Sequence, residues 1–151
     1  MIINFQPIPI SKPNPMNLLR PVFQIHHSDC VTASLACAFS TSYDFIAQAF
    51  LSRHLNPTNP WHEIQILKEV LPKRWVRATS PRLAPNSIYL VTVPAKCARL
   101  HHRVVVQVLG TGYPLLYDPF IHRSTKLYNG TAHYASWEDS PSYGNIVRVL
   151  G

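Results

Sequence analysis

The hydrophobic pattern of the chain changes once, from a helical period before residue 72 to a strand period after residue 87. In the first part, apolar side chains recur three and four positions apart, as they do on one face of an α-helix. In the second part, β-branched and aromatic residues gather in short runs at 87–93, 103–109, 113–117 and 145–150. Helices followed by strands predict an α+β fold, with N-terminal helices packed on a C-terminal antiparallel sheet.

Three helices are expected, and each follows a residue whose side-chain oxygen can accept hydrogen bonds from the free N–H groups of a first turn. The first begins at Cys30, the second after Ser42 and the third at Pro60, and the proline at position 72 ends the third. The capping residues are Ser28 or Asp29, then Ser42, then Asn59. The apolar faces are Phe45, Ile46, Ala49 and Phe50 in the second helix and Ile64, Leu67 and Leu71 in the third.

The length of 151 residues fits one domain with a core of its own. Four prolines within residues 1–20 predict an extended arm there, followed by a single domain over residues 21–151. No stretch is apolar over the roughly 18 residues of a membrane span, and the first 15 residues lack the pattern of a secretory signal. The three cysteines fit neither a disulfide framework nor a CxxC metal pair, and they favour a reducing compartment, the cytoplasm.

The net charge of +7 comes from scarce acidic residues rather than from a dense basic tract, since only 14% of the residues are charged. The nearest basic cluster consists of Lys73, Arg74, Arg77 and Arg82. Such a cluster is more often a solvated rim than a nucleic-acid footprint. Nucleic-acid binding is therefore kept only as an alternative.

Cys30 stands at the expected start of the first helix, within QIHHSDCVTASLACAF (residues 24–39). The N-terminal end of a helix stabilises negative charge, so a thiol there loses its proton more easily, and the thiolate is the nucleophile. Gln24, six residues earlier, carries an amide able to donate a hydrogen bond to an oxyanion beside the sulfur. A buried structural cysteine would explain Cys30 alone, so the prediction of a nucleophile depends on the rest of the chain.

A histidine and an aspartate flank the expected hairpin of the sheet. The sequence Gly-Thr-Gly at residues 110–112 predicts the turn, so paired residues have numbers that add to about 222. His102 then lies opposite residue 120, and Asp118 lies two positions along the neighbouring strand on the same face. A carboxylate there orients the imidazole, as in a nucleophile–base–orienter triad. His101 is the rival base, but strand alternation directs it to the opposite face.

The order Gln-x5-Cys at a helix start, then His-x-Val-Val-Val, a hairpin and Tyr-Asp-Pro, resembles the papain-like cysteine peptidases. The nearest form is the compact type that processes bacteriocin leaders. The order is also similar to compact leader proteases of some RNA viruses and, more loosely, to transglutaminases. The resemblance covers roughly residues 22–120. It implies a papain-like fold in which Cys30 attacks, His102 is the base, Asp118 orients it and Gln24 lines the oxyanion hole.

The activity implied is a cysteine peptidase that cleaves a peptide or isopeptide bond through a thioester acyl-enzyme, with a protein or peptide substrate and no cofactor. One alternative is a viral leader-type protease of the host cytoplasm that releases itself from its polyprotein or removes ubiquitin-like modifiers. An acyl transferase would share the thioester. A catalytically inactive papain-like binding module and a basic nucleic-acid-binding domain are the alternatives without this chemistry.

Two residues depart from the peptidase pattern. Val31 stands where that type usually has glycine, which is expected to narrow the cleft beside the nucleophile, and Arg103 follows the histidine in place of an aromatic or aliphatic residue. Both favour the inactive-module alternative. No metal site is expected, because no HxxxH or CxxC spacing supports the histidines that could suggest zinc: His26, His27, His122 and His133.

Overall fold

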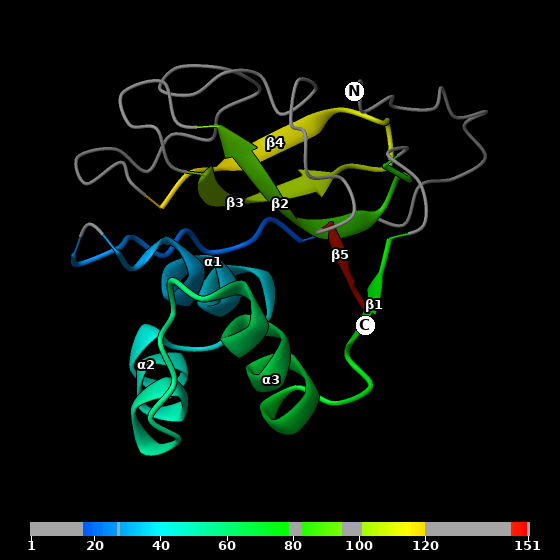
Figure 1. Ribbon diagram of the computed structural model, residues 1–151. Helices are drawn as coiled ribbons and strands as arrows, with labels where there is room; N and C mark the ends of the chain where they lie inside the picture. The colour runs from blue at the N-terminus through cyan, green and yellow to red at the C-terminus, as the bar shows by residue number, and fades with distance from the viewer. Residues whose placement is uncertain (1–16, 27, 79–82, 95–100, 120–145, 151) are drawn as a thin grey trace.

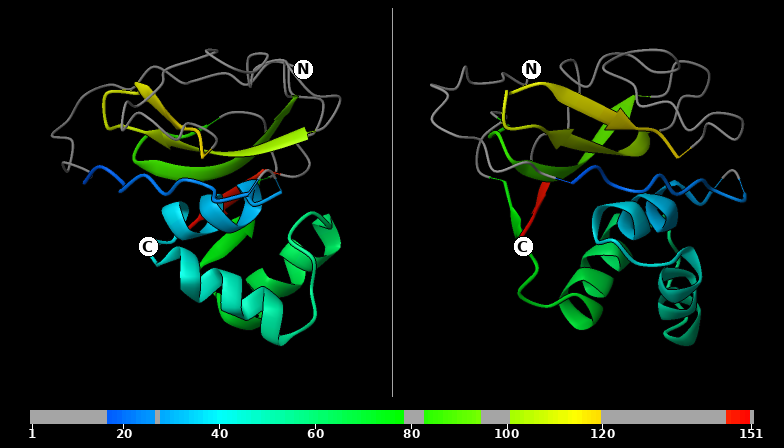
Figure 2. Two further views of the ribbon diagram at one scale, coloured as in Figure 1. Left: turned by 90° about the vertical axis from the view of Figure 1, so that its left-hand side faces the viewer. Right: turned by 180° about the vertical axis from the view of Figure 1, so that it is seen from behind.

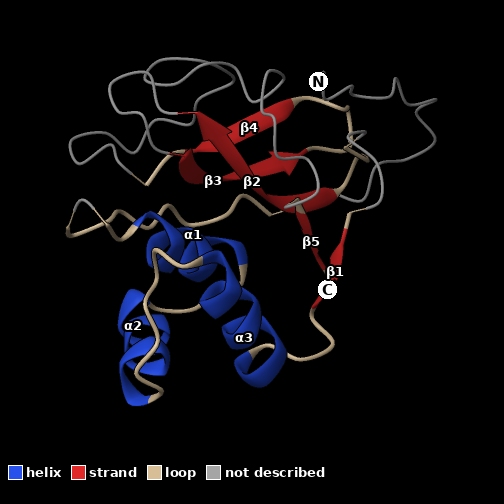
Figure 3. Cartoon of the chain, in the orientation of Figure 1, coloured by secondary structure: helices blue, strands red, loops and turns tan. Residues whose placement is uncertain are grey.

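The protein, seen here in a computed structural model, is described over residues 17–26, 28–78, 83–94, 101–119 and 146–150. These residues form three helices and a five-stranded antiparallel sheet, which is the expected α+β class (Figures 1 and 3). The helices are α1 (Cys30–Ala38), α2 (Tyr43–Ser52) and α3 (Pro60–Val70). The strands are β1 (Trp75–Arg77), β2 (Ser87–Pro94), β3 (His101–Val108), β4 (Pro114–Tyr117) and β5 (Val147–Val149).

Two of the expected helix caps are confirmed. The Ser42 hydroxyl accepts a hydrogen bond from the N–H of Phe45 at 3.0 Å, and the Asn59 side chain accepts one from the N–H of Trp61 at 2.9 Å. Each bond satisfies a first-turn N–H group that has no partner within its helix. The third expectation is wrong: Asp29 is the N-cap of α1, but its side chain makes no capping hydrogen bond.

Helix α1 lies between the sheet and the other two helices (Figures 1 and 2). Its residues from Thr32 to Ala38 are all buried. The sequence CVTASLACA is apolar or small on every side, which suits a helix covered on every side. Leu35 belongs to one hydrophobic cluster with Ile46 and Phe50 of α2 and with Val105 of β3, so α1 is the centre of the core.

The strand order is β1-β5-β2-β3-β4, so the last strand of the chain lies between the first two. Strands β3 and β4 pair in the expected register, with Val105 opposite Tyr117 and Val106 opposite Leu116. In the turn between them, the N–H of Gly112 donates to the carbonyl of Leu109 at 2.8 Å. Gly112 has φ of 87°, in the region that glycine occupies most readily, so the predicted hairpin is confirmed.

Three details of the elements differ from the sequence prediction. Phe45 of α2 is 51% exposed, because it lies one position away from the face formed by Ile46, Ala49 and Phe50. Leu71 is buried but caps the C-terminal end of α3 rather than belonging to it. Strand β1 was not expected, since three residues are too short a run to show a period.

The segment before Pro21 packs onto the sheet through a buried polar cluster. Gln107, which is fully buried, donates from Nε2 to the carbonyl of Asn17 at 2.8 Å. Its Oε1 accepts hydrogen bonds from the N–H of Leu19 and from the hydroxyl of Tyr117. The end of the expected arm, residues 17–20, is therefore fixed to β3 and β4.

Some predictions fall outside the part of the chain that the structure describes. These are residues 1–16 of the expected extended arm and the positions of His27, His122 and His133. Among the described helices, none combines the length and the apolar character needed to cross a membrane.

Candidate active site

His102 and Asp118 lie side by side on neighbouring strands. His102 Nε2 is 3.0 Å from Asp118 Oδ1, and both side chains are buried, each residue being 7% exposed. The β3–β4 register accounts for this contact, because Asp118 directly follows Tyr117, which pairs with Val105, three residues from His102 on β3. The bond occupies Nε2 and leaves Nδ1 as the ring nitrogen available to another group.

Cys30 reaches this histidine from the end of the helix. Strand β4 pairs with β3 as far as Val105, and the first turns of α1 contact β3 two residues farther along, at Arg103. There the N–H of Arg103 donates to the Cys30 sulfur, and the hydroxyl of Ser34, one turn along α1, donates to the Arg103 carbonyl at 2.9 Å. Both the N–H and the carbonyl of Arg103 thus bond to residues of α1, and these bonds hold Cys30 beside His102.

The pKa of Cys30 is lowered and the pKa of His102 is raised. Burial alone would raise the pKa of Cys30, but hydrogen bonds from His102 and from the Arg103 N–H, with the charge of His102, lower that pKa overall. Burial alone would lower the pKa of His102, but hydrogen bonds to Asp118 and Cys30 and their negative charges raise it overall. The pair therefore favours a thiolate beside an imidazolium, the reactive form of a nucleophilic cysteine.

The loop before α1 turns the Asp29 carboxylate away from the helix end. Its Oδ2 accepts a hydrogen bond from the N–H of His26 at 2.9 Å and one from the hydroxyl of Tyr43 at 2.5 Å. Because the side chain of the N-cap residue, Asp29, makes no capping hydrogen bond, it leaves the N–H groups of the first turn of α1 to another acceptor. If the Cys30 sulfur attacked a carbonyl group, the resulting oxyanion would lie beside these donors.

Gln24 is buried in the same loop. Its backbone N–H donates to the carbonyl of Pro119 at 2.9 Å, which ties the loop to the residue after Asp118. Its Nε2 donates one hydrogen bond, to the carbonyl of His26 at 2.8 Å, so one of the two amide hydrogens is engaged. Its Oε1 is buried with no partner among the residues that the structure describes. Gln24 thus lies beside the triad, with its amide directed along its own loop.

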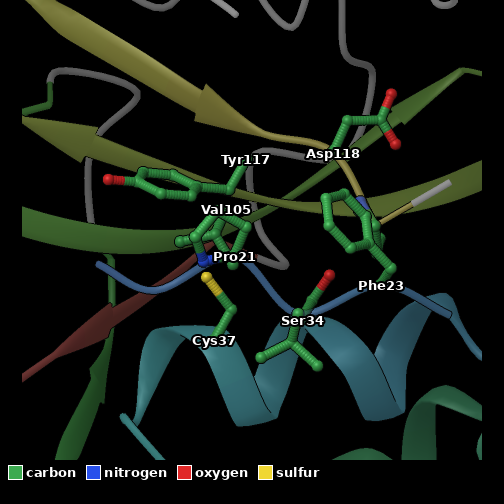
Figure 4. Close-up of a pocket in the computed structure, with 9 residues that line it drawn as sticks. Pro21, Phe23, Ser34, Cys37, Val105, Tyr117 and Asp118 are labelled. Atoms are coloured by element: carbon green, nitrogen blue, oxygen red, sulfur yellow. The ribbon is translucent and has the colours of Figure 1, made fainter. Parts of the chain in front are cut away.

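A small hollow lies between residues 21–23, α1, the middle of β3 and the end of β4 (Figure 4). Ser34 and Cys37 point into it from α1, while the Asp118 carboxylate points away from it. Cys30 and His102 do not line it. The hollow therefore lies beside the loop that carries Gln24, one turn of α1 away from Cys30.

The sequence did not indicate several residues that support the site. Ser34 follows Cys30 by four residues, so helical spacing alone places both on one face of α1 and was a usable signal. No local pattern links Arg103 to Glu63 of α3, yet Arg103 Nε lies 3.0 Å from Glu63 Oε1. Val31 is half-buried against the core.

Two other sequence inferences concern the histidines. His101 opens β3 opposite Pro94, and its side chain lies outside what the structure describes. Within the described residues, no group of three or more His, Cys, Asp or Glu side chains is arranged to hold a metal ion.

Comparison of the chain with protein-family models, with curated proteins and with solved structures gave no match. The site itself consists of a cysteine at a helix end, a histidine and an aspartate, joined by hydrogen bonds.

Proposed function

We propose that this protein is a papain-like cysteine peptidase that cleaves a peptide or isopeptide bond with Cys30, His102 and Asp118. The observation that carries the proposal is the position of His102, which bonds Asp118 on one side and Cys30 on the other. A structural cysteine needs no such partner, and one buried without charged partners has a raised pKa. Cys37, in the same helix, is that case: burial raises its pKa to about 12.

In the first half of the reaction, the Cys30 thiolate attacks the carbonyl carbon and the carbonyl oxygen becomes an oxyanion. The backbone N–H of Cys30 and the free amide hydrogen of Gln24 are the proposed donors to that oxyanion. The imidazolium of His102 then gives its proton to the leaving amine, the C–N bond breaks and a thioester forms on Cys30.

In the second half, neutral His102 takes a proton from water, and the resulting hydroxide attacks the thioester. The C–S bond breaks, the acyl group leaves as a carboxylic acid and the Cys30–His102 pair is restored. Asp118 keeps the ring oriented through both halves and balances the positive charge of the imidazolium. No step needs a further cofactor.

The proposal is tested by alkylating the full chain with iodoacetamide over a range of pH and locating the label by peptide mass spectrometry. Cys30 is expected to react at pH 6 at least about tenfold faster than Cys37, because the pKa of Cys30 is lowered whereas that of Cys37 is raised, so the Cys30 thiol has the larger thiolate fraction. Replacing His102 by alanine should remove that difference. Cys37→Ala is the matched control, since it removes a cysteine of the same helix and should leave Cys30 reactive.

Cleavage itself is tested by incubating wild type and Cys30→Ala, each with its native flanking sequence, with a mixed peptide library and measuring the products by mass. Cleavage by wild type alone supports peptidase activity, including cleavage of the chain's own flanks. If Cys30 reacts no faster than Cys37 and no peptide is cut, the protein is a binding module with a papain-like arrangement of residues.

A further inference from the structure

Arg103 is a buried arginine immediately after the proposed base. The side chains of Arg103 and Glu63 are 5% and 9% exposed, and Arg103 Nε lies 3.0 Å from Glu63 Oε1. Arg103 Nη1 also donates to the hydroxyl of Thr92 on β2 at 2.8 Å. Buried charges are rare unless they are paired, and a buried pair is weak evidence for added stability. A role other than stability therefore has to be considered.

The main chain of Arg103 is in contact with the nucleophile. Its N–H donates to the Cys30 sulfur, and its carbonyl accepts a hydrogen bond from the Ser34 hydroxyl, so this residue is one of those that hold α1 to β3. Its side chain reaches α3 and β2 at the same time. Arg103 thus fixes one point of β3 relative to α1, α3 and β2, and that point is one residue from His102.

We infer that Arg103 is a positioning residue. Its buried ion pair with Glu63 holds its backbone N–H against the Cys30 sulfur and keeps His102 within reach of that sulfur. This inference rests on the proposed function and adds to it a group outside the triad. It also gives the departure from the peptidase pattern at position 103 a physical reason, since a residue that binds α3 takes the place of an apolar one.

The charged groups around the sulfur come from several elements. His102 and Arg103 belong to β3, Glu63 to α3, Asp118 follows β4 behind His102, and Asp29 precedes Cys30 in the chain. Glu63 by its charge opposes ionisation of Cys30, whereas the Arg103 N–H and His102 favour it. Removing Glu63 alone would take the carboxylate away from the buried Arg103 guanidinium, so the informative variant removes both members of the pair. Loss of the Glu63 charge would by itself lower the pKa of Cys30, so a profile moved to higher pH has to come from the N–H of residue 103.

The test compares Arg103→Met/Glu63→Leu with wild type, because apolar residues of similar size replace a buried ion pair without leaving an unpaired charge. The measured quantity is the rate of Cys30 alkylation between pH 5 and pH 9, corrected for the folded fraction. The matched control is Arg53→Met/Glu69→Leu. It makes the same changes in an ion pair of the same 3.0 Å length whose side chains are 35% and 45% exposed.

We expect Arg103→Met/Glu63→Leu to react about tenfold more slowly at pH 6, with its pH profile moved to higher pH, because the N–H of residue 103 is no longer held at the sulfur. The control should keep the wild-type profile. Arg103→Lys, which retains a cation for Glu63, should recover part of the rate. A folded double variant with the wild-type profile would overturn the inference.

A second variant covers the case in which the double variant does not fold. Thr92→Val removes the hydroxyl that accepts a hydrogen bond from Nη1 and keeps the shape of the side chain, and we expect a loss of about threefold at pH 6. An unchanged rate in Thr92→Val would then count against the inference. Wild-type Cys30 without enhanced reactivity would overturn the proposed function instead, so the two failures are distinguishable.

Discussion

Nε2 of His102 lies 3.0 Å from Oδ1 of Asp118, and the two residues are sixteen positions apart in the chain. A two-stranded ribbon with a Gly-Thr-Gly turn brings them together, because its register sets both the face and the diagonal offset. The contact orients Nδ1 toward the helix end that carries Cys30. The hairpin therefore supplies the histidine–aspartate pair, and α1 brings Cys30 to it.

Asp118→Asn should keep the hydrogen bond to His102 but remove the negative charge. Since the carboxylate raises the pKa of His102, the imidazolium in the variant should lose its proton at lower pH. We expect peptidase activity at pH 7 to fall about tenfold or more, with the alkaline limb of the pH–rate profile moved to lower pH.

The matched control for that variant is Asp44→Asn, which changes an exposed carboxylate in the first turn of α2. It should leave the pH–rate profile unchanged. An Asp118→Asn protein with the wild-type alkaline limb would show that Asp118 does not hold the charge of His102.

Gln24→Ala should lower the rate of peptide cleavage about 100- to 1,000-fold, which is the usual cost of losing one oxyanion donor. The alkylation rate of Cys30 should change little, since alkylation by iodoacetamide forms no oxyanion. Measuring both rates on the same preparation separates a role in the transition state from damage to the loop. Equal losses in the two rates would mean that Gln24 acts only by holding the loop, through its bond to His26.

Tyr43→Phe should destabilise the loop before α1. The hydroxyl of Tyr43 donates to Asp29 at 2.5 Å, and its removal leaves a buried carboxylate with one hydrogen bond fewer. We expect the free energy of unfolding in urea to fall by about 1.5–3 kcal/mol, as for a hydrogen bond to a charged group. Alkylation of the folded protein should stay close to wild type if the loop keeps its shape. Unchanged stability would show that water replaces the hydroxyl.

The sequence was sufficient where the signal is local. The helix starts at Ser42 and Asn59, the turn at 110–112 and the β3–β4 register all depend on residues close together in the chain. The diagonal offset of His102 and Asp118 follows from that register. These features could be predicted because short-range geometry determines them.

The remainder depends on contacts between distant segments. Nothing near Arg103 indicates that its side chain will meet Glu63, forty residues earlier in α3. The place of β5 between β1 and β2 likewise depends on pairing between strands that are far apart in the chain. Asp29 is a residue type that often caps a helix, but its carboxylate instead accepts hydrogen bonds from the Tyr43 hydroxyl and the His26 N–H. Single-sequence patterns carry no information on such competition.

Cys37 should make the protein sensitive to alkali. Its thiol is buried in the core, and burial raises its pKa from 9.0 to about 12, so the folded state keeps the proton that the unfolded chain releases above pH 9. The stability due to this group is complete below pH 9 and is lost as the pH rises toward 12. The loss should be about 1.4 kcal/mol for each pH unit in that window.

The measurement is urea unfolding of wild type and Cys37→Ala from pH 7 to pH 11. At pH 7 the variant should be less stable by about 1 kcal/mol, because the smaller side chain leaves unfilled space beside the hollow. Above pH 9 its stability should fall less steeply than that of wild type, so that the two curves approach and then cross. Tyr43, whose pKa is also raised, is present in both proteins and cancels in the difference. The raised pKa of Tyr117 cancels in part, because burial raises it in both proteins whereas the charge of Cys37 contributes only in wild type. Parallel curves over the whole range would mean that the Cys37 thiol ionises equally in the folded and unfolded states.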